Sequence, residues 1–312
     1  MSNKLSSEQL RWLECISRLK VDHSRGPAPH KPLLLLVLCD LVDENLVANG
    51  LIERNGALAF RFNSYWTVVS DRRRTRPEVL LPFFHMHSDG VWIPLDSDGV
   101  KTDNRKNARI AQLDASLLIS LQASEFRIEF RRTIIARYFQ GSERAELFEM
   151  CKLEMPPSEI VDSDADKYLV LNDSPRKRDT KFSARVLPAY DFTCALTNYR
   201  MVSESGSCPL DAAHIKQFKK GGICHPNNGL ALSKNAHWLF DRGFWSIDDD
   251  YRILVDDDQF EENGEDALLL KPRDGERLFL PKNVPFWPNR DNLKWHRNHH
   301  KFEYFLWFAR IP

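Results

Sequence analysis

The fold is decided by three short stretches, Leu210-Asp211-Ala212-Ala213-His214-Ile215, His225-Pro226-Asn227-Asn228-Gly229-Leu230 and Asn235-Ala236-His237-Trp238-Leu239-Phe240-Asp241. The first is typical of a short apolar strand that ends at His214, and a polar loop with two glycines follows at residues 219–222. Asn228-Gly229 predicts a turn, and the spacing from Ala231 to Asp241 predicts a helix. The chain is therefore expected to form a β-β-α unit.

The polar side chains of this unit suggest a metal site beside a base. His237 and Asp241 stand four apart in the expected helix, so they share one face and could hold a divalent ion together. His214 would approach from the strand, where an imidazole that is not a metal ligand can take a proton from water. Asn228 is expected to pin the loop through hydrogen bonds from its side chain to the backbone.

The three stretches resemble the HNH nucleases of the ββα-metal class, and most closely a branch found in restriction endonucleases. The resemblance covers roughly residues 182–307. It implies that His214 is the general base, that Asn228 positions it, and that His237 binds a divalent metal, Mg²⁺ or Mn²⁺.

One position departs from the family pattern. Many HNH nucleases have an Asp directly before the first His as a metal ligand, whereas this chain has Ala213. We therefore assign the second ligand to Asp241. Asp211 lies three residues before His214 and is expected to point to the other face of an ideal strand.

The composition is that of an ordinary globular protein. The chain has 312 residues, 42% hydrophobic and 28% charged, with a net charge of zero, which argues against indiscriminate binding of polyanions. None of the six cysteines forms a C-x-x-C pair, so we expect reduced thiols in a cytoplasmic protein and no structural zinc site. The longest apolar run, residues 33–39, is far shorter than the roughly 20 residues that cross a bilayer.

The N-terminal half mixes helix and strand patterns. Ser6 to Gln9 form a capping box before a first helix, and a second, fully apolar helix is expected to start at Pro29-His30-Lys31-Pro32, where free N–H groups favour a phosphate. The remaining patterns predict a hairpin over residues 51–62 turning at Asn55-Gly56, a strand pair at 80–84 and 91–95, and helices at 108–121, 126–139 and, near the other end, 291–308.

Three motifs in this half, PHKPLLLL (29–36), LPFF (81–84) and SDGVW (88–92), resemble the sulfur-binding domain of phosphorothioate-dependent restriction enzymes. The resemblance runs over about residues 1–150. It implies that His30 and Lys31 contact the modified backbone and that Pro82 and Phe83 form an apolar cavity for the sulfur. Leu81 stands where the family has Tyr. An Arg that completes the site would be Arg105 or Arg109.

The physical basis of such recognition is simple. Sulfur in place of a non-bridging phosphate oxygen gives a larger and more weakly hydrated anion. An apolar concavity flanked by cations would bind it in preference to ordinary DNA. Arg185 and Arg242 are further candidate DNA contacts. His296, His299 and His300 have a spacing that would allow a second metal site, and the alternative is that they form a polar face of the helix.

These features predict an α+β protein with a modified-DNA recognition domain at residues 1–155, a linker at 156–181 and an HNH endonuclease domain at 182–312. The expected function is metal-dependent hydrolysis of double-stranded, phosphorothioated DNA. Two alternatives stay open: an HNH endonuclease for methylated, hydroxymethylated or unmodified DNA, and a DNA-binding regulator without catalysis. One active site per chain would imply a homodimer or two sequential nicks for a double-strand cut.

Overall fold

The computed structural model describes residues 5–24, 26–47, 49–73, 76–155, 175–265 and 269–302, with the backbone alone at 175–180. The chain divides into two compact units, one of residues 1–174 with 204–207 and one of residues 175–203 with 208–312. The part of the predicted linker at 156–174 lies outside the described residues. The part at 175–181 belongs to a helix, α9 (Pro175–Ala189).

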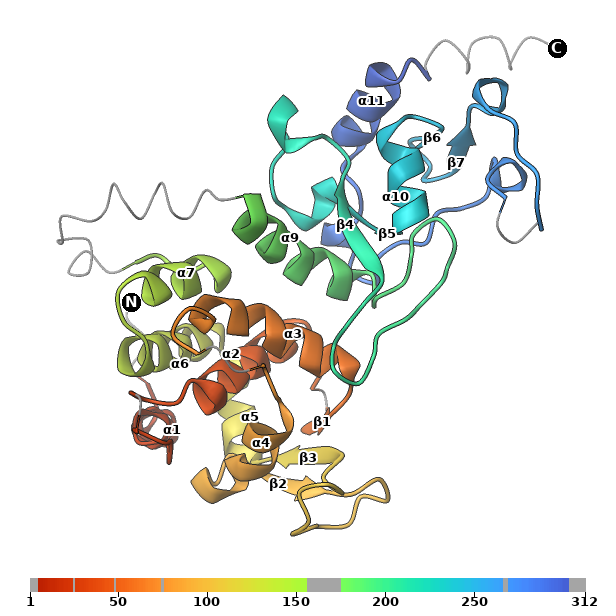
Figure 1. Ribbon diagram of the computed structural model, residues 1–312. Helices are drawn as coiled ribbons and strands as arrows, with labels where there is room; N and C mark the ends of the chain where they lie inside the picture. Colours follow the sequence, from red (N-terminus) through yellow and green to blue (C-terminus); the bar gives the residue numbers. More distant parts are fainter. Residues whose placement is uncertain are drawn as a thin grey trace. The chain divides into compact units, whose positions relative to one another are not determined.

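The helices of the N-terminal unit pack mainly on one another, and a three-stranded antiparallel sheet with strand order β1-β3-β2 lies at one edge of the unit (Figure 1). Its strands are β1 (Leu51–Glu53), β2 (Trp92–Leu95) and β3 (Ile110–Leu113). The helices of this unit are α1 (Ser7–Ser17), α2 (His30–Asp43), α3 (Gly56–Trp66), α4 (Leu80–His85), α5 (Ala115–Gln122), α6 (Ser124–Tyr138) and α7 (Ser142–Met150), with 3₁₀ turns at Thr67–Val69 and Met86–Asp89.

The central helix of this unit is α2, as the sequence predicts. Every residue from Leu33 to Cys39 is at most 1% exposed, because α2 packs against α3, α4 and α6. The capping box of α1 is also present, since Ser6 Oγ accepts from Gln9 N and Gln9 Oε1 accepts from Ser6 N.

Three predicted elements of this unit are wrong. Asn55 does not turn a hairpin; its side chain caps α3 by accepting from Leu58 N at 3.0 Å. Residues 80–84 form the helix α4 and not a strand, and the helix predicted at 108–121 is divided into β3 and α5. Short apolar runs fit helix and strand equally well, so tertiary packing decides between them.

The C-terminal unit contains the predicted β-β-α order. β4 (Leu210–His214) pairs antiparallel with β5 (Gly229–Ser233), with His214 opposite Gly229, and α10 (Lys234–Asp241) follows at once. The helix begins at Lys234 and not at Ala231, because Ser233 caps it by accepting from Ala236 N. The remaining elements are β6 (Trp245–Ile247), β7 (Ile253–Val255), α11 (Arg290–His299) and 3₁₀ turns at Phe218–Lys220, Pro226–Asn228, Asp257–Gln259, Lys271–Arg273 and Val284–Phe286.

Helix α9 packs against β4 and β5 at a position where only glycine fits. A Cβ on Gly229 would lie 2.5 Å from Val186 Cγ2 and 2.8 Å from Phe182 Cζ. This close approach brings the Phe182 ring to the end of β4.

The last predicted helix is shorter than expected in the described chain. It ends at His299, and residues 303–312 lie outside the described part. Within the described residues, no helix combines the length and apolar character that a membrane span requires. None of the six cysteines, all of which lie in the described residues, forms a disulfide.

Candidate active site

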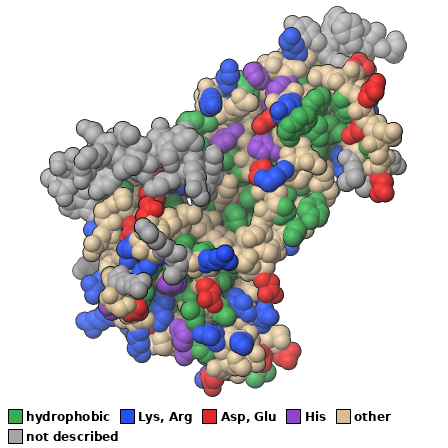
Figure 2. All heavy atoms as spheres, in the orientation of Figure 1, with side chains coloured by type: hydrophobic (Ala, Val, Ile, Leu, Met, Phe, Trp, Pro, Cys, Tyr) green, Lys and Arg blue, Asp and Glu red, His purple; other side chains and the backbone are tan. Residues whose placement is uncertain are grey.

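A cleft of about 500 Å³ in the C-terminal unit brings together three of the four residues that the sequence selected for chemistry. On the face shown in Figure 2, histidine side chains gather over this unit with acidic and basic side chains beside them. The cleft is lined by Ser183, Leu210, Asp211, Ala212, His214, Gln217, Phe218, Lys219, His237 and Asp241.

His214 lies at the end of β4, and one face of its imidazole ring is covered by an aromatic side chain. The Phe182 ring stacks on it with 3.8 Å between centroids and 9° between planes. The ring's Nε2 lies 3.5 Å from Cys224 Sγ, on the loop that returns to β5. An aromatic stack and a polar neighbour together restrict the rotation of the ring.

Asn228 lies beneath the loop and has no exposed surface. Its Oδ1 accepts from Lys216 N at 2.9 Å, and its Nδ2 donates to Lys216 O at 3.0 Å and to Ile223 O at 2.9 Å. These three bonds tie both ends of the loop that follows His214. Gly222 belongs to the same packing, because a Cβ there would lie 1.8 Å from Lys216 O.

His237 stands between two carboxylates. Its Nδ1 is 3.4 Å from Asp211 Oδ2, and its Nε2 is 3.4 Å from Asp241 Oδ2. Asp211 Oδ1 also accepts from Lys234 Nζ at 2.9 Å. The expectation that Asp211 points away from the site is wrong, because α10 packs on β4 and brings His237 within reach of this side chain.

The Nε2 of His237 and the carboxylate of Asp241 fit a divalent ion. Two ligand atoms that each lie about 2.1 Å from one ion are about 3.0 to 3.4 Å apart. The pair leaves most coordination positions to water and phosphate oxygens, which is how Mg²⁺ is commonly bound. Residues 5–302, apart from their undescribed gaps, contain no group of three or more His, Cys, Asp or Glu side chains arranged around one ion.

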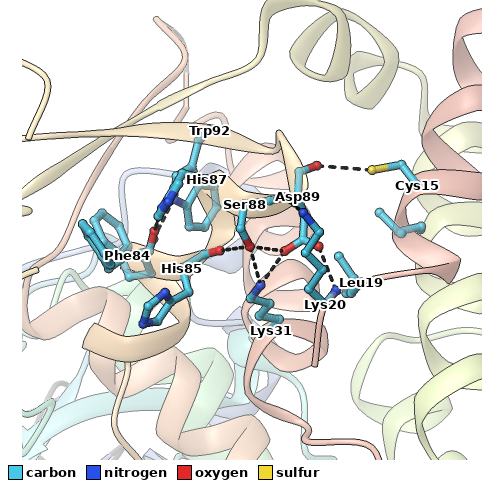
Figure 3. A network of polar contacts seen from close by, with 12 residues as sticks. Cys15, Leu19, Lys20, Lys31, Phe84, His85, His87, Ser88, Asp89 and Trp92 are labelled. Carbon is cyan, nitrogen blue, oxygen red and sulfur yellow. Dashed lines mark hydrogen bonds and ion pairs between the residues drawn. The ribbon is translucent and has the colours of Figure 1, made fainter. Parts of the chain in front are cut away.

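The structure places Lys31 in the interior of the N-terminal unit. Figure 3 shows its side chain reaching from α2 to Ser88 and Asp89. Its Nζ lies 2.5 Å from Asp89 Oδ2 and 3.1 Å from Ser88 Oγ, and the side chains of Lys31 and Asp89 are 9% and 4% exposed. Lys31 is thus a buried ion pair and does not face a phosphate, because a buried ammonium requires its charge to be paired.

Pro82 and Phe83 are also buried, and Phe83 has no exposed surface. The Phe83 ring packs against Trp92, whose indole N–H donates to Phe83 O at 2.7 Å. The helical conformation of α4 turns both residues into the core. The predicted sulfur cavity is therefore not formed by these side chains in this structure.

The other candidate DNA contacts have different surroundings. His30 is half-buried with its ring 4.7 Å from Trp66, and this burial, together with Arg73, lowers its pKa. Arg105 and Arg109 are exposed, Arg185 is half-buried, and Arg242 is exposed with its guanidinium 4.0 Å above the Trp238 ring. None of these residues lines the cleft.

His296 is a core residue of α11. Its Nδ1 lies 2.8 Å from Ser246 Oγ, its Nε2 lies 3.1 Å from Phe240 O, and its ring stacks on Phe240 at 3.8 Å. Burial lowers its pKa well below the ordinary value. Both ring nitrogens are engaged, so the metal site considered for the α11 histidines is not formed.

Sequence reasoning missed Phe182, Asp211, Cys224 and Lys219 as neighbours of the site. Phe182 and Cys224 carry no motif, and their proximity to His214 depends on how α9 and the loop pack. Gly229 is a signal that could have been used, because a glycine opposite His214 allows a bulky side chain to approach.

Comparison with known protein families finds a match in the segment that contains the β-β-α unit. Residues 194–248 match the model of an HNH endonuclease family, a region that includes β4, β5, α10 and β6. No curated protein was found to match the chain. A similar solved structure is described as a modification-dependent TagI restriction endonuclease, at 23% identity and a TM-score of 0.29. That alignment covers 41% of this chain and 39% of the other, so it spans less than half of either.

Proposed function

We propose that the chain is a divalent-metal-dependent DNA endonuclease of the HNH type. One observation carries the proposal: a single cleft contains the His214 imidazole together with the His237 and Asp241 pair, inside the region that matches the HNH model. Hydrolysis of a phosphodiester needs a base for water and a positive charge at the phosphate. The cleft has residues suited to both tasks.

His214 acts as the general base and takes a proton from the attacking water. Phe182 and Cys224 hold its ring in one orientation, so little orientational freedom is lost when the substrate binds. Asn228 is a positioning residue, since it is fully buried and acts through the loop. Lys219, which lines the same cleft, offers a cation to a phosphate oxygen.

His237 and Asp241 would hold the ion. A bound divalent cation supplies polarisation of the scissile phosphate and stabilisation of the leaving oxygen. Mg²⁺ and Mn²⁺ suit one imidazole and one carboxylate with water in the remaining positions.

The N-terminal unit is proposed to recognise modified DNA, and phosphorothioated DNA is the first candidate. The support is the resemblance of residues 1–150 to sulfur-binding domains, together with the exposure of Arg105 and Arg109. The burial of Lys31, Pro82 and Phe83 counts against the specific cavity that the resemblance implies. Methylated, hydroxymethylated and unmodified DNA are therefore the alternatives to compare.

The test uses one plasmid prepared with and without phosphorothioate linkages, incubated with the protein in Mg²⁺, Mn²⁺ or EDTA. We expect cleavage of the sulfur-bearing plasmid only with metal. Equal cleavage of both plasmids would retain the nuclease and overturn the sulfur specificity. Absence of cleavage on these and on methylated and hydroxymethylated plasmids would favour a DNA-binding regulator.

A further inference from the structure

The two carboxylates beside His237 cannot have the same role. The Nδ1 and Nε2 lone pairs of an imidazole point away from opposite sides of the ring, so one ion cannot bind both. Asp211 lies 3.4 Å from Nδ1, whereas Asp241 lies 3.4 Å from Nε2. One carboxylate therefore shares the ion with His237, and the other orients the ring.

The surroundings of the two carboxylates distinguish these roles. Asp211 Oδ1 already accepts from Lys234 Nζ at 2.9 Å, and its Oδ2 faces His237. The Lys234 side chain is 75% exposed, so its ammonium offsets the charge of this carboxylate only in part, but it still disfavours a second cation beside Asp211. Asp241 is the more exposed of the two, with 43% of its side chain accessible against 35% for Asp211. The ion is thus favoured on the Nε2 side, with Asp241.

We propose that Asp211 is a positioning residue, which accepts a hydrogen bond from Nδ1–H of His237 and so presents the Nε2 lone pair for metal binding. Lys234 in turn holds Asp211. The inference rests on the proposed function, because it takes His237 and Asp241 as the metal ligands. It adds Asp211, which stands two residues before Ala213, as a residue that acts on the His237 ring and not as a metal ligand.

The contacts of Asp211 also help to fix the position of α10 relative to β4. Lys234 and His237 are three apart and lie on one face of α10, so a single carboxylate from β4 contacts both. The alignment of the metal pair with His214 at the other end of β4 then depends on Asp211. Partners of this kind commonly change metal affinity by about 10- to 100-fold when removed.

The first experiment measures Mn²⁺ affinity of the full chain by titration calorimetry, without DNA, for the wild type and the variants Asp211→Ala, Asp241→Ala and Lys234→Gln. We expect Asp241→Ala to abolish measurable binding and Asp211→Ala to weaken it by about 10- to 100-fold. Lys234→Gln, which leaves the Asp211 carboxylate in place, is expected to have the smallest effect. Unchanged urea midpoints would show that each variant is folded.

The second measurement reports the tautomer of His237 directly. The ¹⁵N chemical shifts of the imidazole in the metal-free protein should show a proton on Nδ1 in the wild type and a mixture of tautomers in Asp211→Ala. A general loss of packing would not produce that change. If Asp211→Ala abolished Mn²⁺ binding while Asp241→Ala retained it, or if Asp211→Ala changed neither affinity nor tautomer, the inference would be overturned and the proposed nuclease would stand. A wild type that binds no divalent metal would overturn both.

Discussion

At His214, the neighbours of the imidazole decide how the ring is presented to the cleft. Phe182 covers one face, and Cys224 Sγ lies 3.5 Å from Nε2. Cys224 is partly exposed, whereas Cys39 and Cys194 are buried. A partly exposed cysteine therefore lies next to the proposed base.

We predict that alkylation of Cys224 inactivates the enzyme, because a maleimide group on Sγ would fill the space beside Nε2. Nuclease activity after N-ethylmaleimide treatment should fall in the wild type and in Cys208→Ala, which retains Cys224. The Cys224→Ala variant should keep most of its own untreated activity. Equal inactivation of Cys224→Ala would contradict this arrangement.

The gathering of His214, His237 and Asp241 in one cleft was predictable from the sequence, whereas the surroundings of these residues were not. His237 and Asp241 follow from helical spacing, and His214 follows from the end of an apolar strand. The position of Asp211 depends on where α10 crosses β4, and Lys31 is paired with Asp89, 58 residues away. No local pattern encodes such contacts between distant segments.

At the scale of elements, the packing of α9 on β5 places Phe182 beneath His214. We predict that Gly229→Ala destabilises the C-terminal unit by about 1 to 3 kcal/mol, because the added Cβ would lie 2.5 Å from Val186 Cγ2. The measurement is the urea midpoint together with the cleavage rate, which should fall as Phe182 is displaced. The double variant Gly229→Ala with Val186→Ala should recover part of both, and no recovery would argue against this clash.

Helix α11 gives the C-terminal unit a dependence on pH. Burial lowers the pKa of His296 well below the ordinary 6.5, so below pH 6.5 the unfolded chain binds a proton that the folded chain does not. The stabilisation is complete above pH 6.5 and declines as the pH falls below it. His300, in the same unit, has a pKa that is lowered by burial and by His299 and adds to this trend, and the lowered pKa of His30 gives the N-terminal unit a pH dependence of the same sign.

We predict that the urea midpoint of the protein decreases when the pH is lowered from about 7.5 to about 5.5. The decrease should be smaller in His296→Gln. Gln removes the titrating group while retaining a polar side chain near Ser246 and Phe240. Identical pH dependence in the variant and the wild type would show that His296 is not responsible.

The predictability of elements followed the length of their patterns. The buried helix α2 follows from a long apolar run, and the β-β-α order follows from a change in the spacing of apolar residues along the sequence. Both were predicted. Residues 51–62 and 80–84 are short apolar runs, and Asn55-Gly56 fits a hairpin turn as well as a helix cap. Packing against α2 selected the helical alternatives.

At the scale of the whole molecule, two compact units separate the proposed tasks of recognition and cleavage. Because the net charge of the chain is zero, electrostatic attraction to DNA would come from local groups of basic side chains and not from the electric field of the whole molecule. With one candidate active site in the described part of each chain, a double-strand cut would need two chains or two successive nicks.

The central claim is that His214 is the base of a metal-dependent nuclease. The most direct measurement compares the wild type with His214→Ala for both binding and cleavage of the same modified plasmid in Mn²⁺. We predict that the variant binds the DNA with unchanged affinity and cleaves it at least about 100-fold more slowly, as expected when a general base is removed. Cleavage by His214→Ala at the full wild-type rate would contradict the account.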